Sequence, residues 1–189
     1  TLNTTDDAKL RRLLADLLCY CRATQNYAGE TENLTDSEAW IKRGFATLND
    51  VDYEKPTDKA VTSDCNNKTA SWKSAALVLK NNVAVRFRFT AQNAENLKAV
   101  VTVNGKGTTV TDIKSDGTAY YFDFDNLYVS QFLDTMTVRI YSGDTQISNT
   151  LTYSVYSYAL SKHNDSNGNL GKLVDSIMNY GLSAQAYIK

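Results

Sequence analysis

One motif occurs twice in this chain of 189 residues, and the repeat constrains the fold more than any other feature. Leu13–Tyr27 reads LLADLLCYCRATQNY, and 160 positions later Leu173–Tyr187 reads LVDSIMNYGLSAQAY. Apolar residues recur three and four positions apart in both copies, which is the spacing of one helix face. Four residues are identical at matched positions: Leu13 and Leu173, Tyr20 and Tyr180, Gln25 and Gln185, and Tyr27 and Tyr187. The repeat predicts two related amphipathic helices that bracket the rest of the chain.

Terminal signals set the expected helix bounds. The first helix should run from about Thr5 to Tyr27, with Thr4 and Asp7 as a capping box and Gly29 as its end. A second helical piece should begin at Thr35 and place Trp40, Ile41 and Phe45 on its apolar side. A short helix is expected over 154–162, and the last helix over 170–188 with Asn169 as N-cap. Because neither terminal helix can bury its apolar stripe alone, we expect the two to pack together.

The middle of the chain changes from helical spacing to a period of two. Val83, Val85, Phe87 and Phe89 alternate with smaller or polar residues, as in a half-buried strand. Asn104-Gly105 is a strong hairpin signal, and similar turn signals separate about seven short strands. The fold class is therefore predicted as α+β, with an immunoglobulin-like antiparallel β-sandwich and packed N- and C-terminal helices.

The same patterns predict a single module over 1–189, divided into four parts. Residues 1–48 should hold the N-terminal helices and 49–71 a polar connector. Residues 72–153 should form the β-sandwich. Residues 154–189 should form the C-terminal helices, closing on the first helix.

Composition narrows the classes of partner. The net charge of −1, from 20 basic and 21 acidic residues, gives no electrostatic reason to expect nucleic acid or an anionic membrane. No apolar run approaches the roughly 20 residues of a membrane helix. No leader segment is visible before Thr1, which leaves open a removed leader or an excised module.

Three cysteines are too few for a disulfide scaffold. Cys19 and Cys21 lie two apart on an expected helix, so their side chains point to different sides. Cys65 could pair with either of them, but buried thiols are the favoured interpretation. Together with the single His163, the cysteines make a poor zinc set.

Catalytic and metal-binding motifs are sparse. The only histidine, His163, is expected in a solvated loop, and no serine-hydrolase, zinc-protease or P-loop motif occurs. Asp123 and Asp125 would lie about 7 Å apart on one strand face, a separation compatible with an inverting glycosidase. We favour a solvated strand face for them, and solvent or turn roles for the acidic segments 50–54 and 165–169. No enzyme activity, metal or cofactor is expected.

Three segments carry a resemblance to a known module. They are LLADLLCYCRATQNY, SWKSAALVLKNNVAVRFRF, and NLYVSQFLDTMTVRIYSGDTQISNTLTYSVYSYALSKHNDSN followed by LVDSIMNYGLSAQAY. With these, nearly the whole chain resembles a helix-flanked immunoglobulin-like module repeated in large secreted or cell-surface proteins of gut Firmicutes. Such modules stand beside glycoside hydrolases, dockerins and carbohydrate-binding domains. The resemblance implies an extracellular or cell-surface, non-catalytic module, although Cys21 stands where the usual pattern has a small residue.

Aromatic residues are the remaining candidates for ligand binding. Sugar rings stack their apolar faces on exposed aromatic rings while neighbouring polar groups bind the hydroxyls, the general logic of small-ligand sites. We therefore predict binding of a polysaccharide or oligosaccharide, such as a plant or storage glucan including starch. The alternative is a structural or protein-interaction module that spaces or anchors neighbouring domains. For the tryptophans the alternative to ligand binding is packing, of Trp40 against the helices and of Trp72 over an edge of the sandwich. The predicted carbohydrate-binding residues are Trp72, Tyr121, Tyr141, Asp123, Arg139 and Arg88.

Overall fold

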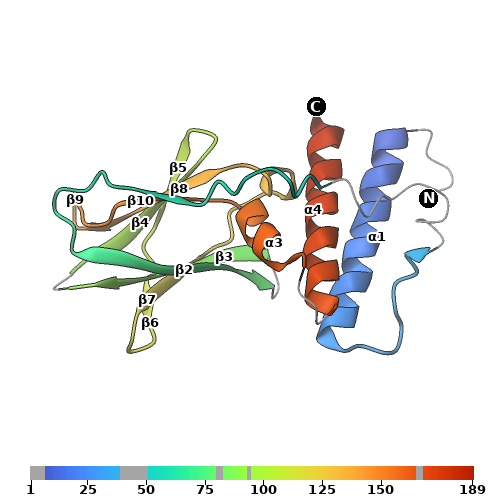
Figure 1. Cartoon of the computed structure of the whole chain (residues 1–189), viewed down its shortest axis with the longest axis horizontal. Helices are drawn as coiled ribbons and strands as arrows, with labels where there is room; N and C mark the ends of the chain where they lie inside the picture. Colours follow the sequence, from blue (N-terminus) through green and yellow to red (C-terminus); the bar gives the residue numbers. More distant parts are fainter. Residues whose placement is uncertain (1–6, 39–50, 80–82, 93–94, 165–167) are drawn as a thin grey trace. The chain divides into compact units, whose positions relative to one another are not determined.

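A computed structural model describes residues 7–38, 51–79, 83–92, 95–164 and 168–189 (Figure 1). The chain divides into two compact units. The first comprises Thr1–Pro56, Tyr128–Leu133 and Ala159–Lys189, and the second comprises Thr57–Leu127 and Asp134–Tyr158. The fold is α+β, with helices concentrated in the first unit and two antiparallel sheets in the second.

The first unit is built on two long helices, α1 (Ala8–Ala28) and α4 (Asn169–Ile188). The backbone N–H of Leu10 donates to the Asp7 side chain at 3.0 Å, so Asp7 is the N-cap of α1. The expected cap residue Thr4 lies outside the described residues. Gly29 ends α1 in the left-handed conformation, at φ 80°, as predicted.

The two copies of the repeated motif lie against each other in opposite directions (Figure 1). Asn169 at the start of α4 donates to the carbonyl of Asn26 near the end of α1, at 3.2 Å. Near the middle of the pair, the rings of Tyr20 and Tyr180 stack with centroids 6.0 Å apart. These tyrosines occupy matched positions of the repeat, so the helix pair has an approximate two-fold symmetry.

The face of α1 that is most deeply buried is small and polar rather than leucine-rich. Ala15, Asp16, Cys19 and Ala23 are buried, whereas the expected leucine stripe, 13–18, is only half-buried at its four leucines. The two terminal helices do pack together, as expected, but the most buried positions of α1 are these small and polar residues rather than the leucines. Small side chains allow close approach of the helices, and the leucines lie toward other sides of α1.

Asp16 is the charged residue at the centre of this contact. Its side chain is 1% exposed, and it accepts a hydrogen bond from the Ser183 hydroxyl of α4. Arg12 Nε lies 3.6 Å from Asp16 Oδ2 within α1. Burial, and secondarily the Asp16 charge, raise the pKa of the Cys19 thiol to about 11, which keeps it neutral. All three cysteines are free thiols, so Cys65 forms no bridge with the helix.

The second unit contains two antiparallel sheets. The larger has the order β1-β10-β8-β4-β5, with β9 beside β8, and the smaller has the order β2-β3-β7-β6. Helix α3 (Val155–Lys162) follows β10. The strands are β1 (Ala60–Thr62), β2 (Ala70–Leu79), β3 (Val83–Ala91), β4 (Leu97–Val103), β5 (Lys106–Val110), β6 (Lys114–Ser115), β7 (Tyr120–Phe124), β8 (Met136–Ser142), β9 (Thr145–Gln146) and β10 (Thr150–Tyr153).

These ten strands of the described residues exceed the expected seven because β1, β6 and β9 are too short to show a period. Strand β1 lies in the range expected as a connector, and its Ala60 pairs with Thr152 of β10. The predicted hairpin at Asn104-Gly105 is confirmed: both residues have positive φ, and the flanking Val103 and Lys106 pair.

Aromatic side chains from both sheets form the core of the second unit. Phe87 of β3 is fully buried and stacks on Phe122 of β7, with ring centroids 5.3 Å apart. From the other sheet, Tyr153 meets the edge of Phe87 at 6.0 Å. The larger sheet adds a buried inner row from β8, comprising Met136, Val138 and Ile140. Because side chains alternate between the two faces along each strand, one face of each sheet is buried in the core and the other carries polar side chains.

Gly181 of α4 packs closely on the short helix η1 (Val129–Gln131) and the residue that follows it. A Cβ at this position would stand 3.2 Å from Phe132 Cβ and 3.3 Å from the Val129 carbonyl oxygen. Substitution Gly181→Ala should lower the free energy of unfolding by roughly 1–2 kcal/mol, because overpacking outweighs the gain in helix propensity. Urea unfolding would measure this change.

Lys172→Ala, at an exposed position of the same helix, is the control and should change stability by less than ~0.5 kcal/mol. If Gly181→Ala were as stable as the unmodified protein, η1 would be able to shift away from the added methyl group without loss of folding free energy.

Candidate ligand-binding site

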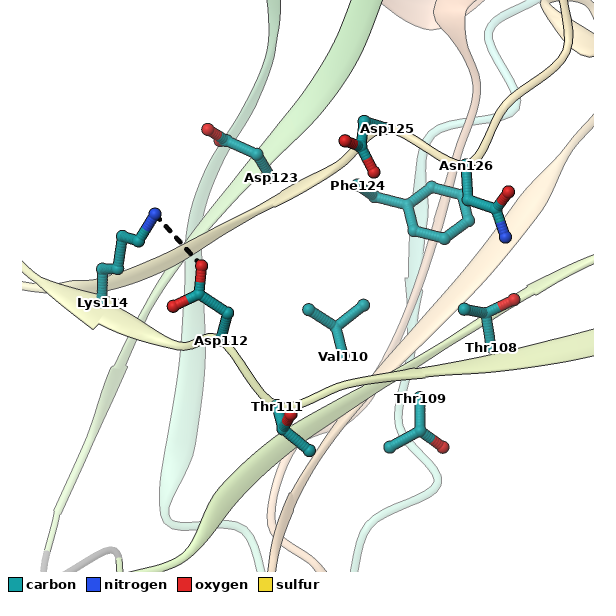
Figure 2. A pocket seen from close by; sticks show the side chains of 10 residues that line it. All are labelled: Thr108, Thr109, Val110, Thr111, Asp112, Lys114, Asp123, Phe124, Asp125 and Asn126. Carbon is teal, nitrogen blue, oxygen red and sulfur yellow. Dashed lines mark ion pairs between the residues drawn. The ribbon is translucent and has the colours of Figure 1, made fainter.

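A hollow of about 530 Å³ opens beside β5 and β7 in the second unit (Figure 2). Its wall combines hydroxyl, amide and carboxylate side chains with two apolar ones. The lining residues are Thr108, Thr109, Val110, Thr111, Asp112, Lys114, Asp123, Phe124, Asp125 and Asn126. Concave sites with a small apolar surface and a few placed polar groups are suited to bind small polar ligands.

Strand register explains why these residues meet. Thr108 pairs with Val101 and Val110 with Ala99, so both side chains lie on the core side of the larger sheet. Strand β5 is the last strand of that sheet, and Phe124 closes the hollow from β7. The site is therefore formed where the edge of one sheet meets a strand of the other.

Two ion pairs neutralise part of the charge around the hollow. Arg86 donates Nε and Nη2 to the two carboxylate oxygens of Asp123, at 2.6 and 2.7 Å. Its guanidinium carbon also lies 4.6 Å from the centre of the Tyr121 ring. The hydrogen bond to Asp123 raises the pKa of Arg86, so this pair remains charged. Lys114 Nζ lies 3.1 Å from Asp112 Oδ2.

Asp125 and Asn126 are the polar side chains most available to a ligand. Both are exposed and line the hollow directly after β7 ends. Neither side chain has a hydrogen-bond or ion-pair partner within the described parts of the chain. Figure 2 shows the two side chains at the end of the hollow that lies away from Lys114. They can therefore receive a ligand without breaking an existing contact.

Three of the predicted site residues come together on the outer face of the smaller sheet. Arg88 pairs in register with Tyr121, and Asp123 is the register partner of Arg86 on the same face. Arg88 is ion-paired with Asp116. Asp123 also lines the hollow, so this group borders the candidate site.

Tyr141 and Arg139 lie elsewhere, on β8 of the larger sheet. Arg139 Nε donates to the Thr150 hydroxyl at 2.8 Å. The Lys98 ammonium lies 6.0 Å from the centre of the Tyr141 ring. The structure therefore separates these two residues from Tyr121, Asp123 and Arg88 by placing them on the other sheet.

Trp72 faces the core side of β2 and is half-buried. Its indole N–H donates to the carbonyl oxygen of Asn149 at 2.8 Å. Its ring meets the edges of Phe89 and Phe87, with centroids 6.0 and 6.3 Å away. These contacts match the packing alternative, in which Trp72 covers an edge of the two sheets. Trp40, the other tryptophan, lies outside the described residues.

Asp123, Asp125 and His163 are the described residues that the sequence raised for acid–base chemistry. Asp123 is held by Arg86, and Asp125 lies beyond the end of β7. The ring of His163 stacks on Tyr53, with centroids 3.9 Å apart. No group of three or more His, Cys, Asp or Glu side chains among the described residues could hold a metal ion. The described helices include none that is both long and apolar enough to cross a membrane.

Sequence reasoning missed most of the hollow. Asp112, Lys114, Asn126 and the threonines of β5 were not candidates, because the two strands that join them belong to different sheets. The one available signal was the run Thr108–Thr111, which presents several hydroxyls on both faces of a single strand.

Comparisons with family models, curated proteins and solved structures found no match to this chain. The function must therefore be inferred from the chemistry of the site itself.

Trp72→Ala should lower the free energy of unfolding by about 3 kcal/mol, because it removes aromatic packing and leaves the Asn149 carbonyl without its donor. Trp72→Phe keeps most of the ring and should cost about 1 kcal/mol, mainly the hydrogen bond. Chemical denaturation of both variants tests this order. If Trp72→Ala were as stable as the unmodified protein, Trp72 would not be a packing residue and would again be a candidate for stacking on a sugar ring.

Asp116 should make stability sensitive to acid. Hydrogen bonds from the Thr118 hydroxyl and the backbone N–H groups of Thr118 and Ala119, with the charge of Arg88, lower its pKa to about 2. Because the folded pKa is below the unfolded value, this stabilisation is complete above about pH 4 and is lost as pH falls toward 2. The stability difference between the unmodified protein and Asp116→Asn should shrink across that range. Urea unfolding at several pH values measures it, and a constant difference would contradict the assignment.

Proposed function

We propose that this chain is a non-catalytic module that binds an uncharged carbohydrate in the hollow beside β5 and β7. The supporting observation is the composition of its lining, which offers threonine hydroxyls, the Asn126 amide and the Asp125 carboxylate around Val110 and Phe124. Sugar hydroxyls can donate to a carboxylate and exchange hydrogen bonds with hydroxyls and amides. Apolar side chains can contact the C–H faces of a sugar ring.

The charge around the hollow favours an uncharged ligand. Three carboxylates line it, from Asp112, Asp123 and Asp125, against the single ammonium of Lys114. Lys114 and Arg86 are already paired with carboxylates. A sugar acid would therefore approach net negative charge, with no uncommitted cation in the lining to receive it. A glucan, such as starch or a plant β-glucan, meets this requirement.

The setting of the module is part of the proposal. The sheet orders β2-β3-β7-β6 and β10-β8-β4-β5 correspond to the A-B-E-D and G-F-C-C′ orders of immunoglobulin-like sandwiches, which supports that topology. The resemblance to modules of secreted Firmicutes proteins supports an extracellular or cell-surface location.

A structural role in spacing neighbouring domains is the second candidate. The antiparallel pairing of α1 and α4 brings the start of one helix and the end of the other to the same end of the pair (Figure 1). Such adjacent ends suit a unit inserted between other domains.

Binding can be tested by affinity electrophoresis against starch, β-glucan, xylan and pectin, followed by calorimetry with matching oligosaccharides. Asp125→Ala and Asn126→Ala should each weaken binding of an uncharged glycan by about tenfold, because each removes a ligand hydrogen bond. Neither change should lower stability, since both side chains are exposed and unpartnered within the described residues.

Matched controls distinguish this hollow from the other sheet face. Asp144→Ala removes an exposed carboxylate in the turn between β8 and β9, and Tyr141→Ala removes the aromatic candidate on β8; both should leave affinity unchanged. A loss with Tyr141→Ala alone would move the binding site to β8. Absence of binding to all four polysaccharides would favour the structural role.

A further inference from the structure

Helix α4 carries a buried amide without hydrogen bonds. Asn179 is 2% exposed, and neither its Nδ2 nor its Oδ1 has a hydrogen-bond partner among the described residues. Buried polar side chains in folded proteins are almost always hydrogen-bonded, because an unpaired one loses its bonds to water without replacement. Within the described residues this amide is therefore left with two unused hydrogen-bonding groups at the centre of α4.

The symmetry of the helix pair indicates why Asn179 lacks a partner. Two contacts between the helices use matched motif positions: Asp16 of α1 with Ser183 of α4, and Tyr20 with Tyr180. The other residues at these positions, Cys19 and Ala23 in α1 and Ser176 and Asn179 in α4, are buried, and we infer from the helical spacing that they share the same faces. The Asp16–Ser183 hydrogen bond and the Tyr20–Tyr180 stack fix an antiparallel register, from which we infer that Cys19, the matched residue of α1, lies within one helical turn of Asn179. A neutral thiol is only a weak hydrogen-bonding group for an amide.

A second copy of α4 would supply the missing group. If two α4 helices paired in this register, Asn179 would face Asn179 of the other copy, and each amide could donate N–H to the other carbonyl. Tyr180 would likewise stack on its counterpart, and Ser176 would face Ser183. A single buried asparagine pair at a helix contact is a known determinant of which helices associate.

The two helices are not equally anchored. In α4, the apolar residues Leu173, Val174, Ile177 and Met178 are at most 1% exposed. Gly181 of the same helix packs on η1. In α1, the matched leucines are only half-buried. If α4 of a second copy replaced one helix of the pair, α1 would therefore be the helix that dissociates, because it is the less buried of the two.

We propose that two copies of this chain associate through α4–α4 pairing, with α1 displaced from each. This goes beyond carbohydrate binding and does not depend on it. The hydrogen bond between Ser183 and Asp16 opposes the exchange, since it exists only while α1 is docked. The resting chain is thus held closed by Asp16, and Asn179 favours the paired form.

Sedimentation velocity of the full chain over a range of concentrations tests the proposal. Asp16→Ala should strengthen dimerisation at least tenfold, because it removes the contact that holds α1. Adding Asn179→Leu to Asp16→Ala should abolish that gain. Circular dichroism verifies that each variant is folded. A folded Asp16→Ala protein that stays monomeric, or a dimer unaffected by Asn179→Leu, would overturn the proposal.

Disulfide trapping gives a readout that does not require Asp16→Ala to fold. In a full chain with all three cysteines replaced by alanine, Asn179→Cys should form a covalent dimer on oxidation, because the two positions face each other. Lys172→Cys, exposed on the same helix and about 10 Å from Asn179 along its axis, is the matched control. Because its two copies would lie far apart in an antiparallel pair, it should cross-link at least tenfold less. Equal cross-linking of the two variants would contradict α4–α4 pairing.

Discussion

The alternation of side chains along β3 is the constraint on which the second unit depends. Phe87 must face the core, where it meets Phe122 of its own sheet and Tyr153 of the other. A slip of one residue would carry it to solvent and bring Arg86 and Arg88 inside. Burial of this one row therefore also fixes the outer row, and with it the pairing of Arg86 with Asp123 beside the hollow. The polar site is a consequence of the apolar core.

The helical unit uses one motif for two different purposes. Its polar positions form the contact between α1 and α4, where Asp16 accepts from Ser183. Its apolar positions are fully buried in α4 and only half-buried in α1. A buried carboxylate is costly to desolvate, so it contributes more to the choice of partner and register than to net stability. The repeat therefore specifies how the helices pair through a few polar groups, while leucine and isoleucine side chains supply the burial.

Much of this architecture could be predicted from the sequence, because it depends on local signals. The period-two row ending at Phe89, the Asn104-Gly105 hairpin and the Gly29 helix end each lie within a few residues. The direction of Trp72 could not be predicted, since a register shift between Trp72 and Ser74 changes the parity of β2. The hollow could not be predicted from the sequence either, because β5 and β7, which line it, belong to different sheets and do not pair with each other. The pairing of α1 with α4 could be predicted from their apolar stripes, but the deep burial of Asp16 could not, because periodicity identifies an apolar face and says nothing of a polar contact.

The pairing of charges decides which groups of the site can act on a ligand. Arg86 is held from two sides, by the Asp123 carboxylate and by the ring of Tyr121, so a sugar hydroxyl competes poorly for Asp123. Asp125 has no such competitor within the described residues and can accept from a hydroxyl at no cost in existing bonds. Specific recognition therefore falls to the short segment that follows β7, while the ion-paired face beside it provides a rigid border. The outward-facing strand residues that sequence alternation identifies, such as Asp123 and Arg88, are already ion-paired, so they are not expected to contribute most of the affinity for a sugar.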